Sequence, residues 1–266
     1  MMPWNAFGRW FGLALCLSCL ACTTTTSSQS SSGADPIQKM DAQQLRDMGE
    51  KFLAVGDATN ALRFLTVADQ KQPNDAHIQY DLGDAYDARG LPDQALQHFQ
   101  KAIQLKADYP EAYNAMGKVY ADQGRYDDAL QAFQQALGNP FYQTPYLTLF
   151  NTGLVYEKQQ NWQLALSHYQ HALKANKNFG PAYYRMGKVL EAMGRKPEAR
   201  DAYANAVQFA PSVAEVHYDF ARISYETGDF TNAAFSFARV MQLAPNTPMA
   251  ADADRQLQAI EKKRPR

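Results

Sequence analysis

The sequence predicts an all-α protein: a right-handed superhelical solenoid of six helix pairs, closed by a C-terminal capping helix. Three observations predict it. Small and aromatic residues return every 34 residues from Ala42 onward. A glycine divides most repeats, where a left-handed residue would end the first helix. Prolines follow several repeats, where they stop the second helix. A period of this length is typical of stacked helix pairs, each of which buries its apolar face on its neighbours.

Six repeats align, the first three without a gap and the fourth after a slip of two residues. They span residues 42–75, 76–109, 110–143, 146–179, 180–213 and 214–247. In each repeat we expect a glycine of the first helix to approach a small residue of the second, as in the pair Gly83 and Ala95. Aromatic residues such as Phe99 fill the space between neighbouring pairs. These positions are therefore predicted to form the core, without a functional role.

The residues that recur every 34 positions follow the tetratricopeptide repeat pattern, W-x2-L-G-x2-Y…A-x3-F…P. Leu82, Gly83, Tyr86, Ala95 and Phe99 occupy them in the second repeat. The chain thus resembles the tetratricopeptide repeat proteins, whose stacked repeats offer extended concave surfaces to other proteins. Residues 248–262 are mostly polar and predict the capping helix that a solenoid end needs for solubility.

Residues 1–21 stand apart from the repeats. Arg9 is their one charged side chain, and a mainly apolar run follows it. Because that run is shorter than the ~20 residues of a membrane span, it indicates a secretory signal peptide. Its end, Leu20-Ala21-Cys22, resembles the lipobox of bacterial lipoproteins, which implies a covalent lipid at Cys22. Cys19 is a rival acceptor, and ordinary signal cleavage nearby is the alternative.

The cysteines and the following segment fit an anchored protein. All three cysteines, Cys16, Cys19 and Cys22, lie in this region, so cleavage before Cys22 leaves no pair for an internal disulfide. Thr23 follows, not Asp, which in known lipoproteins favours the outer membrane. Residues 22–36 are rich in Thr and Ser and predict a flexible tether with a reach of ~20 Å. We therefore expect a lipid-anchored protein at the periplasmic face of the outer membrane.

Residues 37–266 make up the solenoid. The chain has a formal net charge of −1, which argues against a nucleic-acid-binding face. It has no phosphate-binding G-x-x-x-x-G-K-[ST] and no H-E-x-x-H motif. His168 and His171 lie three residues apart, but no third metal ligand is evident. We expect no enzyme, no metal, no small-molecule substrate and no cofactor beyond the lipid.

Function should then lie on the first helix of each pair, which lines the concave side in these solenoids. The groove is expected to run from an acidic end, through an apolar middle, to an aromatic and basic end. The residues predicted to contact a partner are Tyr80, Asp84, Asn114, Lys118, Leu147, Phe150, Asn151, Leu154, Tyr184, Arg185 and Lys188.

The apolar middle is the most informative part of this groove. Leu147, Phe150 and Leu154 lie on a face that should be wet, which suggests a covered site. The alternative is that the two-residue slip rotates the fourth repeat and buries them. A clamp for a C-terminal carboxylate is not expected, because only Asn151 and Arg185 match its slots.

The slip itself carries a second resemblance. Asn139 to Pro145 read N-P-F-Y-Q-T-P, followed by Asn151 and Gly153 in the next helix. This N-P-x-Y-x-x-P…N-x-G joint, the six repeats and the leader together resemble the type IV pilus biogenesis and stability lipoproteins, the PilF, PilW or Tgl family of pilotins. The resemblance implies that the protein binds the pilus secretin subunit and promotes its localisation and assembly into a multimer. The alternative is a periplasmic scaffold or adaptor for cell-envelope enzymes.

Overall fold

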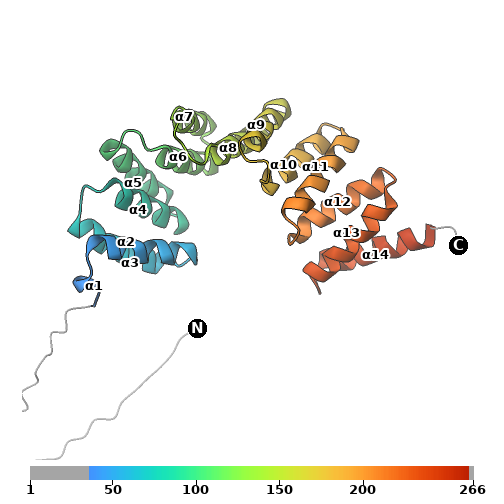
Figure 1. Ribbon diagram of the computed structural model, residues 1–266, viewed down its shortest axis with the longest axis horizontal. Coiled ribbons are helices and arrows are strands. Elements are labelled where there is room, and N and C mark those ends of the chain that lie inside the picture. Colours follow the sequence, from blue (N-terminus) through green and yellow to red (C-terminus); the bar gives the residue numbers. More distant parts are fainter. Residues whose placement is uncertain (1–35, 264–266) are drawn as a thin grey trace, which may run out of the picture.

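The computed structural model describes residues 36–263, and within them the chain forms fourteen α-helices and no strand. The helices follow one another along an open arch whose two ends point the same way (Figure 1). The predicted all-α solenoid is confirmed. The predicted signal peptide, Cys22 and the tether up to residue 35 lie outside the described residues.

Six helix pairs make up the arch, and each pair lies within one of the predicted repeats except that α8 starts one residue early. The pairs are α2 (Ala42–Ala54) with α3 (Ala58–Lys71), α4 (Ala76–Ala88) with α5 (Pro92–Leu105), α6 (Pro110–Asp122) with α7 (Tyr126–Leu137), α8 (Pro145–Lys158) with α9 (Trp162–Ala175), α10 (Gly180–Ala192) with α11 (Lys196–Phe209), and α12 (Ala214–Glu226) with α13 (Phe230–Leu243). The second helix of each pair packs on the first helix of the next. Near the top of the arch α7 and α9 lie on the outer side, and α6 and α8 on the inner side (Figure 1).

Local signals explain where the helices begin and end. The Asp41 side chain accepts a hydrogen bond from the Gln44 backbone at the start of α2, and Gln44 returns one, which forms a capping box. The predicted turn glycines, such as Gly124, have positive φ angles. The fourth repeat has no glycine there, and Gln160 takes a φ of 58° instead.

The core differs from the sequence expectation in one respect. The glycine of each first helix was expected to face an alanine, and this is wrong. A Cβ added to Gly153 would lie 2.5 Å from Cε1 of Tyr169, and one added to Gly187 would lie 2.6 Å from the Tyr203 ring. The glycines thus make room for a large side chain of the second helix. The predicted alanines, such as Ala165, are also fully buried.

Both ends of the solenoid are covered. A short helix that the sequence did not predict, α1 (Pro36–Lys39), places Ile37 in the apolar cluster of the first pair. Lys71 Nζ donates to the carbonyls of Gln38 and Met40 at 2.8 and 2.7 Å. At the other end α14 (Pro248–Lys263) buries Ile260 against α13. None of the described helices is long and apolar enough to cross a membrane.

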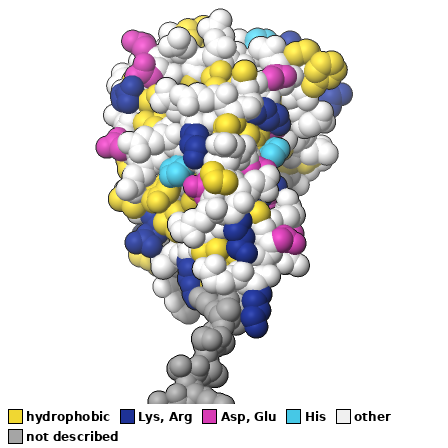
Figure 2. Space-filling view, turned by 90° about the vertical axis from the view of Figure 1, so that its left-hand side faces the viewer, with side chains coloured by type: hydrophobic (Ala, Val, Ile, Leu, Met, Phe, Trp, Pro, Cys, Tyr) yellow, Lys and Arg dark blue, Asp and Glu magenta, His cyan; other side chains and the backbone are white. Residues whose placement is uncertain are grey.

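The surface near the N-terminal repeats has no broad field of one charge. Lys, Arg, Asp and Glu side chains are interspersed there with small apolar patches (Figure 2). This side of the molecule therefore shows none of the single-sign charge that marks a nucleic-acid-binding face.

Candidate protein-binding groove

Polar side chains join the first helices of neighbouring pairs along the inner side of the arch. The partners lie 28 to 37 residues apart, which is about one repeat. We call these contacts the concave network. It comprises Arg46 with Asp81, Asn114 with Thr148 and Asn151, Arg185 with Glu157, Tyr184 and Lys188 with Asp219, Arg222 with Glu191, and Tyr218 with Asp252.

At the N-terminal end the network holds a buried carboxylate. Arg46 Nε lies 2.6 Å from Asp81 Oδ2, and Asp81 is only 4% exposed. Burial raises the pKa of Asp81 to about 7, against the opposing effect of Arg46. The acidic end predicted from the sequence is therefore partly neutralised by an arginine of the preceding helix.

Two predicted residues of α4 lie beside Asp81: Tyr80 precedes it directly, and Asp84 follows about one turn later. Tyr80 packs on Phe99 and Tyr109, with ring centroids 5.7 and 5.3 Å apart, and its hydroxyl is hydrogen-bonded to Asp84. Burial raises the pKa of Asp84 to about 6, and the hydrogen bond from Tyr80 and the charge of Lys118 oppose that rise. Asp84 is thus a half-buried carboxyl group held by its neighbours.

In the middle of the groove the network reaches the joint between the third and fourth repeats. Asn114 Oδ1 accepts from Thr148 Oγ1 and from Asn151 Nδ2, both at 3.0 Å. Thr148 Oγ1 also lies 3.1 Å from the hydroxyl of Tyr142, the buried tyrosine of the joint. The predicted residues Asn114 and Asn151 are therefore brought together, and the joint is bonded to the groove behind them.

The apolar middle is less open than the sequence suggested. Phe150 packs edge-on against Phe179 and tilted against Tyr169, at centroid distances of 5.1 and 5.6 Å. Leu147 and Leu154 are half-buried. The expectation of three wet apolar side chains is corrected for Phe150, because its ring packs on Tyr169 within its own repeat, as Tyr184 packs on Tyr203 in the next.

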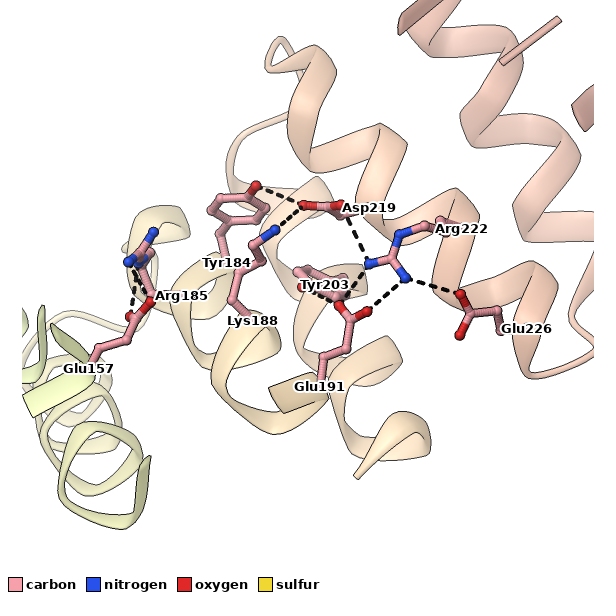
Figure 3. Close-up of polar contacts among 9 residues, drawn as sticks. All are labelled: Glu157, Tyr184, Arg185, Lys188, Glu191, Tyr203, Asp219, Arg222 and Glu226. Atoms are coloured by element: carbon pink, nitrogen blue, oxygen red, sulfur yellow. Dashed lines mark hydrogen bonds and ion pairs between the residues drawn. The ribbon is translucent and has the colours of Figure 1, made fainter. Parts of the chain in front are cut away.

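At the C-terminal end the predicted basic residues are paired (Figure 3). Glu157 accepts from Arg185 Nε at 3.1 Å and Nη2 at 2.5 Å. Asp219 accepts from the Tyr184 hydroxyl at 2.8 Å and from Lys188 Nζ at 3.2 Å. The predicted basic end is therefore wrong, since the carboxylates of neighbouring helices offset its charge.

Beyond these two carboxylates, Arg222 donates to both oxygens of Glu191, at 2.7 and 2.8 Å (Figure 3). Sequence reasoning missed Arg46 and the acidic partners Glu157, Glu191 and Asp219. The signal was present as opposite charges spaced by about one repeat on successive first helices, as at residues 46 and 81.

The groove is hollowed between α6 and α8. Between α6 and α8 lies a cavity of about 160 Å³, with Lys118, Asn151, Leu154 and Lys158 among the residues that line it. This brings four side chains of neighbouring first helices, three of them predicted from the sequence, around one hollow. Lys158 was not predicted as a contact residue.

The histidines show no metal arrangement. His168 stacks on Tyr156 at 5.2 Å, and its ring centroid lies 6.3 Å from that of His171. Among residues 36–263 no group of three or more His, Cys, Asp or Glu side chains is placed to hold a metal ion.

Comparison with known protein families identifies the tetratricopeptide repeat that the sequence pattern predicts. The family described as tetratricopeptide repeat matches residues 114–181 and 184–248, and the one described as TPR repeat matches residues 83–124. No curated protein sequence matches the chain significantly.

Solved structures share the fold. PilW, described as a widely conserved type IV pilus biogenesis factor, superposes with a TM-score of 0.70 at 19% identity, over 79% of this chain and 97% of its own. PilF of Pseudomonas aeruginosa superposes with a TM-score of 0.70 at 20% identity, over 81% of this chain and 97% of its own. YrrB, described as a TPR protein with an unusual peptide-binding site, reaches 0.52 at 22% identity, over 72% and 97%.

Proposed function

Because the chain belongs to the tetratricopeptide repeat family, whose solenoids bind proteins on extended concave surfaces, we propose that it is a pilotin-like lipoprotein. In this proposal it binds the type IV pilus secretin subunit at the outer membrane and promotes assembly of the secretin multimer. The observation that carries the proposal is the similarity to PilW and PilF, which extends over 97% of each of those chains.

The length of the superposition and the joint between the third and fourth repeats favour a pilotin-like protein over other tetratricopeptide repeat proteins. PilW and PilF superpose over 79% and 81% of this chain, with the higher TM-scores of the structures compared above. The N-P-F-Y-Q-T-P joint adds a local feature, and Tyr142 and Thr148 tie it into the groove. The repeat alone would support only a protein-binding scaffold.

The anchor supplies the mechanism of the proposal. A lipid at Cys22 would hold the protein at the inner leaflet of the outer membrane, and the tether would let the solenoid search ~20 Å around that point. A secretin subunit bound in the groove would then be concentrated where it must oligomerise. Tethering of this kind raises the effective concentration of a partner without any new contact.

The groove is suited to this task because its side chains are already ordered. Arg185, Lys188 and Arg222 are held by carboxylates of neighbouring helices. A partner that contacts them would not have to immobilise long flexible side chains, and the entropic cost of binding would be lower.

The test is complementation of a deletion strain with the wild-type gene or with Cys22→Ala. Membrane fractions are blotted for heat-resistant secretin multimers. We expect the multimers to be lost in the deletion strain, restored by the wild type and not restored by Cys22→Ala.

Cys19→Ala is the matched control, since it changes the neighbouring cysteine and leaves the proposed lipid acceptor in place. It should restore the multimers. Normal multimers in the deletion strain would contradict the proposed function, and rescue by Cys22→Ala would contradict the anchoring.

A further inference from the structure

The cavity between α6 and α8 lies where the concave network joins two helices through the neutral side chains Asn114, Thr148 and Asn151. Elsewhere on the inner side, Arg46, Arg185 and Lys188 each form an ion pair with a carboxylate of a neighbouring first helix. Within the part of the chain that the structure describes, neither Lys118 nor Lys158 forms such a pair. Two ammonium groups without such an ion pair thus line one hollow.

The floor of this cavity is apolar and rigid. Phe133 and Val155 are each 1% exposed, and Leu154 lies beside them. The volume is about 160 Å³, and a cavity of about 150 Å³ accommodates a group as large as benzene. The hollow therefore has room for one apolar side chain of a partner.

The charges around the cavity favour a partner segment in which a negatively charged residue lies next to that apolar residue. Its lining contains Lys118, Lys158 and one carboxylate, Asp122, so two positive charges face one negative charge. Asp84 and Asp87 also act on Lys118 from α4 and offset part of its charge. Lys158, at the C-terminal end of α8, is consequently the cation with most capacity for a ligand.

We propose that this cavity seats an apolar side chain of an extended segment of the partner, and that an adjacent Asp or Glu of the same segment pairs with Lys158. The inference rests on the proposed function, because it takes the secretin subunit as the partner. The acidic group is a side chain, so the segment needs no free C-terminus. Asn151, at the cavity rim, is placed to hydrogen-bond the backbone of such a segment.

A peptide array tests the inference. Overlapping peptides with blocked ends cover the periplasmic part of the secretin subunit, and each is probed with the labelled wild-type protein, with Lys158→Glu and with Lys174→Glu. Lys174 is the matched control. Like Lys158, it is an exposed lysine in the last turn of its helix, but that helix is α9, on the outer side. Circular dichroism of each variant confirms that the helices are retained.

We expect the wild type to bind peptides that contain an apolar residue next to Asp or Glu. Lys158→Glu should weaken these signals by about fivefold and raise those of peptides with Lys or Arg in the same place. Lys174→Glu should behave as the wild type. Equal binding by Lys158→Glu, or no preference for acidic neighbours, would overturn the inference.

A parallel measurement separates the two claims. The purified secretin subunit is titrated into the wild-type protein by calorimetry. Binding of the subunit, together with an unchanged array for Lys158→Glu, would overturn the cavity inference alone. No binding of the subunit would contradict the proposed function, and the inference that rests on it would fail as well.

Discussion

Single residues show how closely the helices of a pair approach each other. In the first helix of each of the first five pairs, a glycine lies under a Leu or an aromatic side chain of the second helix, as Gly153 lies under Tyr169. The sequence pattern predicted that these glycines are core. It did not predict their partner, because spacing along one helix does not tell which side chain of the other helix lies above it.

Gly153→Ala tests this contact by the sign of its effect. In an exposed helix, Gly to Ala stabilises by roughly 1 kcal/mol. Here the new Cβ would lie 2.5 Å from the Tyr169 ring, and we expect the free energy of unfolding to fall by about 1–3 kcal/mol from overpacking. Urea denaturation measures it. A stabilised variant would contradict the close contact.

Asp84 makes a pH-dependent contribution to stability. Its pKa is about 6 in the folded protein, above the ordinary value of 3.8, because burial disfavours the charged form. The stability associated with its protonated form is therefore present below pH 3.8 and is lost as the pH rises through about 6.

Asp84→Asn removes this titration. The free energy of unfolding of the variant, minus that of the wild type, should increase between pH 4.5 and pH 8. Urea denaturation at both pH values measures it. The comparison cancels the contributions of titrating groups that do not interact with Asp84. A difference that is independent of pH, or that changes in the opposite direction, would show that burial does not raise the pKa of Asp84.

At the scale of elements, the joint between α7 and α8 was the most predictable irregular feature. Two prolines and a slip of two residues indicated an extended loop, and the loop is present. Its hydrogen bonds were not predictable, since Thr148 contacts Tyr142 and Asn114 through the fold rather than through a local motif. The slip does not rotate the fourth repeat, since Phe150 packs on Tyr169 as Tyr184 packs on Tyr203 in the fifth.

Thr148→Val tests whether the joint is held by these bonds. Valine keeps the shape but loses the hydroxyl, so the buried Tyr142 hydroxyl loses its partner and Asn114 loses one of two donors. We expect a loss of about 1–3 kcal/mol in the free energy of unfolding. Thr66→Val, at an exposed position of α3, is the control and should change it by less than about 0.5 kcal/mol. Equal effects at both sites would contradict the role of Thr148.

The helix pairs themselves followed from periodicity, whereas the electrostatics of the groove did not. Residues such as Arg185 and Lys188 were predicted on the concave side as a basic end of the groove, without their acidic partners. Each is paired with a carboxylate one repeat away. The linear sequence shows both partners, but only the superhelical stacking of α8, α10 and α12 decides which acids reach which bases. The helix α1 was missed because four residues contain no period.

Near the top of the arch, the first helices α6 and α8 lie on the inner side and the second helices α7 and α9 on the outer side (Figure 1). The concave network connects successive first helices across most junctions, and the cavity beside Lys158 lies where neutral side chains make that connection. The central claim is that a secretin subunit binds this inner side. Lys118, on the inner helix α6, and Gln131, on the outer helix α7, are both exposed.

Site-specific photo-cross-linking in cells tests that claim most directly. A photoreactive amino acid replaces Lys118 in one strain and Gln131 in a second, and adducts are identified with an antibody against the secretin. We predict a secretin adduct from position 118 and none from position 131. Adducts from position 131 alone, or none from either position in cells that still assemble multimers, would contradict binding of the secretin in the groove.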